Sequence, residues 1–407
     1  MDMASAPGTT GWDAASRGPE MLHKSGPDRS TLEQRITVLD LAAVQTPAFR
    51  SQWDALIERA SEPNAFFEPW FLIPGLRAWG HGARVTIKAF HVAGTLCALY
   101  PVVRSMRYYG YPVSHATGWL HANAFCGTPL VARGFEHAFW RALLAHFDRS
   151  ARRALFLHLP MLPERGPIAD ALESVLAQQG RTRHFAKRES RAMLASDLSP
   201  QAYFAASMNQ KKRKELRRQH KRLGDLGDLT FERREDDAGL DAWIAQFLAL
   251  EAAGWKGEAG SALAARADTR CFFTETLRGA AGAGRLERLA LRLDGKPVAM
   301  LANFLSGPGA FSFKTSFDED HARFSPGMLL QLENLDLLAR DGIEWADSCA
   351  VEGHLMIERM WREKRELASH NIAIGGRARR ALFAALMAWE NRKGESRAHD
   401  TAKGTAR

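Results

Sequence analysis

The chain has 407 residues, of which 46% are hydrophobic and 25% charged, and its formal net charge is +9. This length favours two domains, and the composition indicates a soluble globular protein rather than a disordered or membrane-spanning one. The excess positive charge favours anionic partners such as phosphates, nucleic acid or an acidic membrane surface.

Residues 1–34 are rich in Gly, Pro, Ser and Asp and contain no long apolar run, so we expect a disordered leader rather than a signal peptide. The spacing of the cysteines indicates neither a metal site nor disulfides. These are Cys97, Cys126, Cys271 and Cys349. We therefore expect a cytoplasmic protein, with the inner membrane surface as a peripheral location, and no bound metal.

The first half of the chain contains several predicted elements. Thr46-Pro47 predicts the start of a helix that runs to about residue 60, because Thr caps helices and Pro fits their first turn. Alternating apolar residues predict a β-hairpin whose strands are joined by Ala93-Gly94. The expected strands are 85–92, 95–104 and 154–159, and a further helix is expected at 135–147.

The second half repeats this plan. A helical stripe begins at Leu240, and a second hairpin turns at Asp294-Gly295. A third strand (311–317), a helix (328–340), a strand (343–349) and another helix (356–365) are expected to follow. The similar hairpins predict a duplicated domain with its boundary near Ser199-Pro200. We therefore expect domains at 35–199 and 200–390, and a flexible basic tail at 391–407.

Several short motifs resemble the GNAT acyltransferases, and among them the FemAB/CelD-like branch. These are Glu251-Ala-Ala-Gly-Trp-Lys-Gly257, Phe313-Lys-Thr-Ser-Phe-Asp-Glu319, Ser325-Pro-Gly327, Asp347-Ser-Cys-Ala350, His354-Leu-Met-Ile357 and Trp361-Arg-Glu-Lys-Arg365, with Asn64-Ala-Phe-Phe-Glu-Pro69 and Gly127-Thr-Pro-Leu-Val131 in the first half. The resemblance implies an α+β fold of tandem GNAT-like domains, each a mostly antiparallel sheet flanked by helices. The C-terminal domain would be the catalytic one and the N-terminal domain degenerate.

The resemblance also implies an N-acyltransferase in which an amine attacks a thioester directly. Acyl-CoA would be the co-substrate, with no permanently bound cofactor, and the acceptor an amino sugar, a polysaccharide precursor or a long-chain base. Relatives of the FemX type use aminoacyl-tRNA instead. A non-catalytic partner in exopolysaccharide or envelope biosynthesis is a third alternative, because Pro326 replaces a glycine of the usual pyrophosphate-binding loop and has no N–H.

The donor site implied by the resemblance lies where a strand passes through a turn into a helix. Backbone N–H groups at a helix start bind phosphates, and here they would come from Gly327, Met328 and Leu329, with Arg323 and Ser325 beside them. The structural alternative is an ordinary helix entry, in which Ser325 is the cap and Pro326 occupies the first turn.

Three residues are candidates for catalysis, namely Glu251, Asp347 and His354. Glu251 shares a helix face with apolar residues, so burial would raise its pKa towards that of a general base, unless it only pairs with Lys256. Asp347 ends a strand and could orient His354 as a proton acceptor. Alternatively, Asp347 caps a turn and His354 is a surface residue.

The candidate substrate contacts are Trp255, Lys256, Lys314, Asp318 and Ser348. Counting by twos along the strand places Lys314 and Asp318 on the face opposite Phe313, as substrate ligands or as a solvated ion pair. Trp255 could instead pack on the core at a helix end.

The segment Lys211–Arg222 contains eight Lys or Arg residues and one Glu. Such a helix could bind tRNA or anionic lipid headgroups, or simply be a solvated helix. Its apolar stripe is too thin for deep insertion into a membrane.

Overall fold

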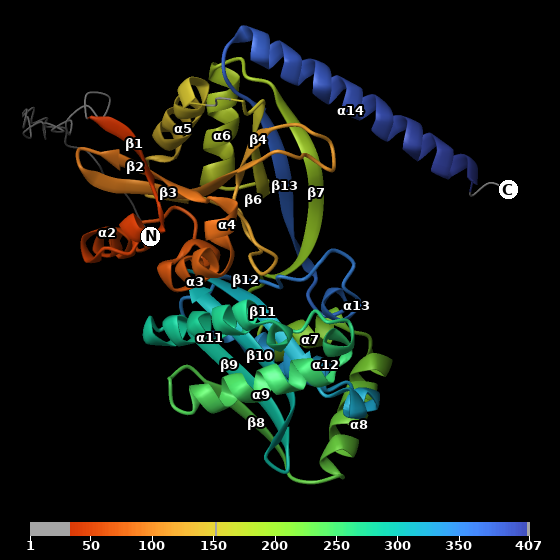
Figure 1. The fold of residues 1–407 in the computed structure, drawn as a ribbon. Helices are drawn as coiled ribbons and strands as arrows, with labels where there is room; N and C mark the ends of the chain where they lie inside the picture. The colour runs from red at the N-terminus through yellow and green to blue at the C-terminus, as the bar shows by residue number, and fades with distance from the viewer. Residues whose placement is uncertain (1–32, 151–152, 405–407) are drawn as a thin grey trace, which may run out of the picture.

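The computed structural model describes residues 33–150 and 153–404, which form two halves, one above the other in Figure 1. The expected leader, 1–34, lies almost wholly outside the described residues. Within these residues, thirteen strands form one continuous sheet. Its order is β1-β2-β3-β4-β6-β13-β7-β12-β11-β10-β9-β8, and β5 pairs with β3. Most neighbours are antiparallel and helices flank the sheet, which confirms the predicted fold class.

The upper half in Figure 1 is built mainly from the first part of the chain. Its strands are β1 (Gln34–Leu39), β2 (Thr86–Val92), β3 (Thr95–Ser105), β4 (His115–Gly118), β5 (Leu130–Val131), β6 (Phe156–Pro163) and β7 (Arg183–Leu194). Its helices are α1 (Leu41–Val44), α2 (Pro47–Ile57), α3 (Pro69–Gly75), α4 (His81–Ala83), α5 (Glu136–Ser150) and α6 (Pro167–Gln178).

The lower half contains the candidate site. Its strands are β8 (Leu229–Arg234), β9 (Leu286–Leu293), β10 (Lys296–Ser306), β11 (Gly309–Phe317) and β12 (Trp345–Asp347). Its helices are α7 (Pro200–Ser207), α8 (Gln210–Gly224), α9 (Leu240–Ala253), α10 (Trp255–Glu258), α11 (Ala267–Gly282), α12 (Pro326–Glu333) and α13 (Leu355–Glu358). Two 3₁₀ helices, η5 (Glu319–Phe324) and η6 (Asn334–Ala339), flank α12.

The two halves share one plan. The hairpin turns at Ala93-Gly94 and Asp294-Gly295 each have two successive residues with positive φ, the conformation of a tight two-residue turn that matches the twist of the strands. In each half the antiparallel strands end beside one parallel neighbour, β4 beside β6 and β11 beside β12. The shared turns and pairings support the predicted duplication.

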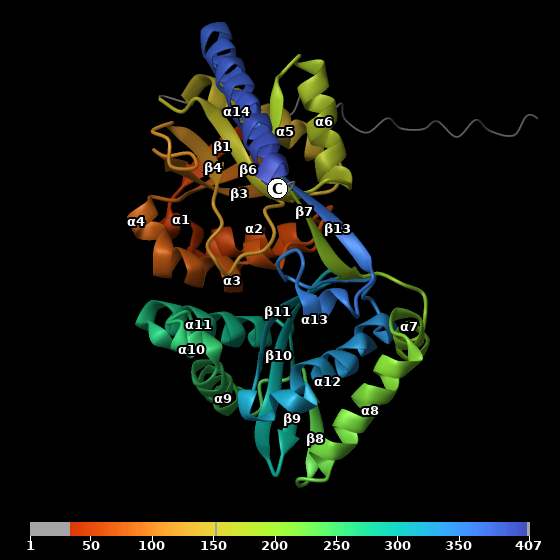
Figure 2. The same cartoon turned by 90° about the vertical axis from the view of Figure 1, so that its right-hand side faces the viewer.

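The last part of the chain crosses back into the upper half. β13 (Glu363–Ala373) lies between β6 and β7 and runs beside β7 in Figure 2, and α14 (Arg377–Gly404) starts at the top of the upper half and then projects away from it (Figure 1). In turn, β7 pairs with β12 of the lower half. The halves therefore exchange strands, so a division at residues 199–200 does not separate their sheets. The segment expected as a flexible tail from residue 391 is helical through Gly404.

Two predicted helices are shorter than expected. The helix predicted at 328–340 is α12 followed by the 3₁₀ turns of η6, and the helix predicted at 356–365 is only α13, because β13 already begins at Glu363. Trp361 lies between α13 and β13 and is fully buried.

A continuous apolar core joins the halves. Phe66 and Phe71 of the upper half contact Phe311 and Phe313 of β11, with ring centroids 5.2 and 5.7 Å apart. The first-half motifs maintain this contact, because the buried amide of Asn64 donates to the carbonyl oxygens of Cys126 and Thr128 at 3.2 and 2.7 Å. Among the described residues, no helix combines the length and apolarity needed to span a bilayer.

Candidate active site

The candidate site lies where two parallel strands separate. β11 and β12 are paired only from Gly309 to Phe311, while β11 continues to Phe317. Beyond Phe311, no described strand pairs with this side of β11. The divergence opens a gap in the sheet, bordered by the end of β11 and by the residues after Asp347. Exposed backbone groups at such a gap can bind and polarise a carbonyl group.

A β-bulge determines which side chains of β11 face the upper half. Ala302 pairs with Lys314 and Asn303 with Ser312, so Phe313 is the additional residue of the bulge. The bulge reverses the alternation of the strand. Lys314 therefore lies on the same face as Phe311, and its predicted position on the opposite face is wrong.

Lys314 is a half-buried cation between the two halves. Its Nζ lies 5.6 Å from the ring centroid of Phe313 and 5.8 Å from that of Phe125, which belongs to an upper-half loop. The structure gives Nζ no hydrogen-bond acceptor within the described residues. Burial lowers the pKa of Lys314 to about 8, and the nearby charge of Lys256 acts in the same direction. Lys314 is therefore mostly protonated at pH 7, with a minor neutral fraction that grows as the pH rises towards 8.

Glu251 forms a buried ion pair at the same end of β11. It is 3% exposed, and its carboxylate accepts hydrogen bonds from Lys256 Nζ and from the N–H of Leu263, each at 2.8 Å. The sequence analysis left two roles open for Glu251, a general base or an ion pair with Lys256, and the structure contains the ion pair. Trp255 is 58% exposed, and its N–H donates to Glu319 at 2.7 Å, so it does not pack on the core.

Asp347 is the centre of a buried charge cluster. It is fully buried and lies 2.9 Å from Arg365 Nη1 and 3.3 Å from Arg191 Nη1, and it accepts the N–H of Cys349 at 2.8 Å. Arg191 also donates to the carbonyl of Phe125 at 2.7 Å, which positions that ring beside Lys314. Asp347 therefore connects β7, β12 and β13 to the surroundings of Lys314.

The structure does not form the predicted Asp347–His354 relay. His354 is exposed at the start of α13, and no hydrogen bond joins the two side chains in the described part of the chain. The N–H of Ser348 donates to the carbonyl of Ala192, and its hydroxyl accepts the N–H of Ala350, so Ser348 stabilises the turn after β12. Burial first, and then the charge of Asp347, raises the pKa of the Cys349 thiol, which makes it a poor nucleophile.

The turn before α12 offers fewer N–H groups than expected. Ser325 adopts φ +53°, and its carbonyl accepts the N–H groups of both Met328 and Leu329. Of the three predicted phosphate donors, only the N–H of Gly327 lacks an acceptor within the described residues. Ser325 makes no side-chain cap, so the alternative of an ordinary Ser cap is also wrong.

A pocket of about 440 Å³, which we call the α8–α12 pocket, lies beside this turn. Its walls come from α8, the end of β11, the start of α12 and α13. Most of the side chains that line it are apolar, and Lys212 and Arg359 add two positive charges. Arg323 instead stacks on Phe324 at 4.7 Å, and Asp318 accepts from Asp320 N–H and contacts His321 Nδ1 at 2.8 Å. Neither Arg323 nor Asp318 lines the α8–α12 pocket.

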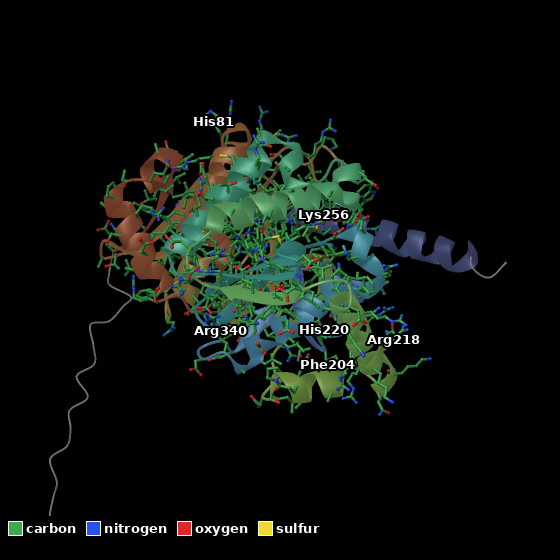
Figure 3. The ribbon with its side chains drawn as sticks, turned by 90° about the horizontal axis from the view of Figure 1, so that it is seen from below. His81, Phe204, Arg218, His220, Lys256 and Arg340 are labelled. Carbon is green, nitrogen blue, oxygen red and sulfur yellow. The ribbon has the colours of Figure 1, made fainter. Side chains whose placement is uncertain are left out.

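The site therefore has two sides. Seen from below, Lys256 lies on one side of the lower sheet, and Arg218 and His220 of α8 lie on the other (Figure 3). The end of β11 joins them, because Phe317 lines both the α8–α12 pocket and a small pocket beside Glu251 and Lys256. Lys314, Glu251 and Lys256 gather on the first side, and Gly327 lies on the second.

Two parts of this site could not be recognised from the sequence. Arg191 lies in a strand of mixed polarity, and Phe125 lies in a loop more than 180 residues before Lys314, so neither could be assigned to the site from spacing. The bulge had a weak signal, since Phe311 and Phe313 are followed by Lys314 without a clear alternation.

Comparisons with known proteins agree with this geometry. Residues 210–355 match a family described as an acetyltransferase (GNAT) domain. No curated protein sequence matches the chain.

The fold is similar to several solved structures. FemX is 11% identical with a TM-score of 0.51, over 83% of this chain and 98% of that one. A conserved protein of unknown function from Bacteroides thetaiotaomicron is 11% identical with a TM-score of 0.50, over 84% and 100%. The C-terminal domain of a candidate lysylphosphatidylglycerol synthetase from Agrobacterium fabrum is 14% identical with a TM-score of 0.50, over 85% and 96%. At these identities the likeness concerns the fold alone.

The domain match identifies residues 210–355 as a GNAT acetyltransferase domain, which contains β11, α12 and the gap after Asp347.

Asp347→Asn should lower the free energy of unfolding by about 3–5 kcal/mol, because it leaves two buried guanidinium groups without their counter-charge. Urea denaturation measures this loss. Ser348→Ala is the matched control and should cost less than about 1 kcal/mol, since only one long hydrogen bond is removed. An Asp347→Asn protein of parental stability would mean that the cluster does not hold the strands together.

Lys314→Met should raise the free energy of unfolding at pH 7 by about 2 kcal/mol, because a depressed lysine pKa means that burial disfavours the charged form. Below pH 8 Lys314 is protonated in both the folded and the unfolded chain, so the full cost of burying its charge lowers the stability of the parent. Between pH 8 and 10.5 the folded chain loses the proton first, so the parent gains stability and the difference shrinks. Denaturation at several pH values tests this, with exposed Lys296→Met expected to change stability by less than about 0.5 kcal/mol. Destabilisation by Lys314→Met at pH 7 would contradict it.

Proposed function

We propose that the protein transfers an acyl group from acyl-CoA to an amine acceptor at the gap between β11 and β12. The observation that carries this proposal is Lys314, a half-buried amine with a lowered pKa and no hydrogen-bond acceptor within the described residues, beside the point where the strands separate. A lysine of this kind can accept a proton near neutral pH.

In this mechanism the thioester carbonyl lies in the gap, polarised by backbone N–H groups of the unpaired side of β11. The acceptor nitrogen attacks the carbonyl carbon and forms the new C–N bond, and the C–S bond breaks. The proton lost by the acceptor nitrogen passes to neutral Lys314, and the departing thiolate then takes up a proton to become the free thiol. Glu251 stays paired with Lys256, and its negative charge favours the protonated form of Lys314.

The α8–α12 pocket would hold the phosphate-bearing part of the donor. Its apolar walls suit the pantetheine arm, while Lys212, Arg359 and the N–H of Gly327 supply positive partners for phosphate groups. The acceptor would approach from the side of Lys256 and Trp255, where an amino sugar, a polysaccharide precursor or a long-chain base could bind. The unpaired cations of α8 favour a second candidate, in which the donor is an aminoacyl-tRNA.

Coenzyme A and acetyl-CoA should raise the melting temperature, because a ligand at about 100 times its Kd adds about 2.7 kcal/mol to the stability of the state that binds it. Thermal shift assays with coenzyme A, acetyl-CoA, palmitoyl-CoA and tRNA compare the candidate donors. Gly327→Pro should abolish the shift, since proline fits the first turn of a helix but has no N–H. A shift with tRNA alone would reject acyl-CoA in favour of aminoacyl transfer.

Lys314→Arg should lower kcat/KM by about 100-fold, because arginine keeps the charge but does not release its proton. In the parent, kcat/KM should rise with pH through about 8 as Lys314 loses its proton, and this rise should disappear in the variant. Release of the free thiol, measured with acetyl-CoA and a panel of amino sugars and long-chain bases, gives both quantities. Lys256→Arg is the matched control and should keep the pH profile. Full activity of Lys314→Arg would remove Lys314 from proton transfer.

A further inference from the structure

Helix α8 presents an unusual concentration of uncompensated positive charge. Arg218 pairs with Glu215 at 2.6 Å and projects from the helix in Figure 3. Six further exposed cations of α8 make no ion pair within the described residues. They are Lys211, Lys212, Lys214, Arg217, Lys221 and Arg222. Since mutual repulsion disfavours such a cluster, an anionic partner would relieve it.

The helix is fixed in place despite its charge. Asn209 caps its first turn through the N–H of Lys212, and Leu216 and Leu223 are buried against the lower half. Its Gln219 also donates to the carbonyl of Arg323 beside the turn before α12. The cations are therefore held on a preformed surface, not on a disordered segment.

Apolar side chains are exposed next to these cations. Val351 and Leu355 are 73% and 70% exposed, the highest values for large hydrophobic side chains in the described part of the chain. Leu355 lines the α8–α12 pocket, and the facing wall of that pocket is α8 itself. Lys212 and Leu355 therefore border the same opening, and Val351 lies four residues before Leu355 in the loop that leads into α13.

We propose that this surface, formed by the six cations of α8 together with Val351 and Leu355, docks on a membrane that contains anionic phospholipids. The lysines and arginines meet the lipid phosphates, and the two aliphatic side chains enter the interface between headgroups and acyl chains. The pocket then opens towards the bilayer, and a substrate with an aliphatic chain can pass directly between the two.

The chemistry of the surface favours lipid over RNA. α8 contains no Phe, Tyr or Trp on which bases could stack, and stacking is a main contribution to single-stranded nucleic-acid binding. Exposed aliphatic groups contribute little to phosphate-backbone binding but do favour a lipid interface. The inference goes beyond the proposed function and does not depend on it, since docking requires neither donor nor acceptor.

Co-sedimentation of the full chain with vesicles tests the proposal. Binding to phosphatidylcholine vesicles containing about 30% phosphatidylglycerol should be at least about tenfold stronger than to phosphatidylcholine alone, and should weaken with salt. Reversal of three cations outside the pocket, Lys211→Glu, Lys214→Glu and Arg217→Glu, should remove this preference. Leu355→Asp should weaken binding severalfold without affecting the fold, because the side chain is mostly exposed.

The matched control reverses three exposed cations of the upper half, Arg35→Glu, Arg84→Glu and Arg133→Glu, and so changes the net charge equally. This variant should bind anionic vesicles like the parent. Equal loss in both triple variants would reduce the effect to net charge and overturn the proposal. Equal binding to both vesicle types would also overturn it. Binding of labelled tRNA without vesicle binding would assign the surface to RNA. None of these readouts needs acyl transfer, so failure of the proposed function would be seen separately.

Discussion

The arrangement of this protein depends on one buried carboxylate. Asp347 lies at the point where β7, β12 and β13 meet, and it neutralises an arginine from each of the two strands that the halves exchange. Because Arg191 also holds the carbonyl of Phe125, the same cluster positions the upper-half loop against Lys314. The carboxylate that the sequence suggested as the orienting partner of His354 thus instead holds together the strands that carry the candidate site.

The bulge at Phe313 shows how such a scaffold creates reactivity. Without the additional residue, Lys314 would face the α12 side of the sheet, where Thr315 now contacts Gln331. With it, the lysine lies against aromatic rings and a second cation, and its charged form is destabilised. Strain and unfavourable electrostatics of this kind are common at functional sites, and the surrounding well-packed core compensates for them.

Much of the fold was predictable because it is local. The hairpin at Asp294-Gly295, the stripe of Leu240 and the cap at Thr46 follow from turn chemistry and periodicity within a few residues. The site was only partly predictable. Glu251, Lys256 and Lys314 were identified as polar residues on expected elements, whereas the partners of Asp347 come from strands distant in sequence. No pattern along the chain indicates that β13 inserts between β6 and β7.

That insertion has a consequence for how the chain folds as it is made. The upper half is synthesised first, yet its sheet lacks a central strand until Ala373 has been added, roughly 180 residues after β7. At about 5–20 residues per second, this leaves β6 and β7 with unpaired edges for about ten to forty seconds. Unpaired edges invite pairing with other chains. The order of synthesis therefore favours chaperone binding to the nascent upper half until β13 has been made.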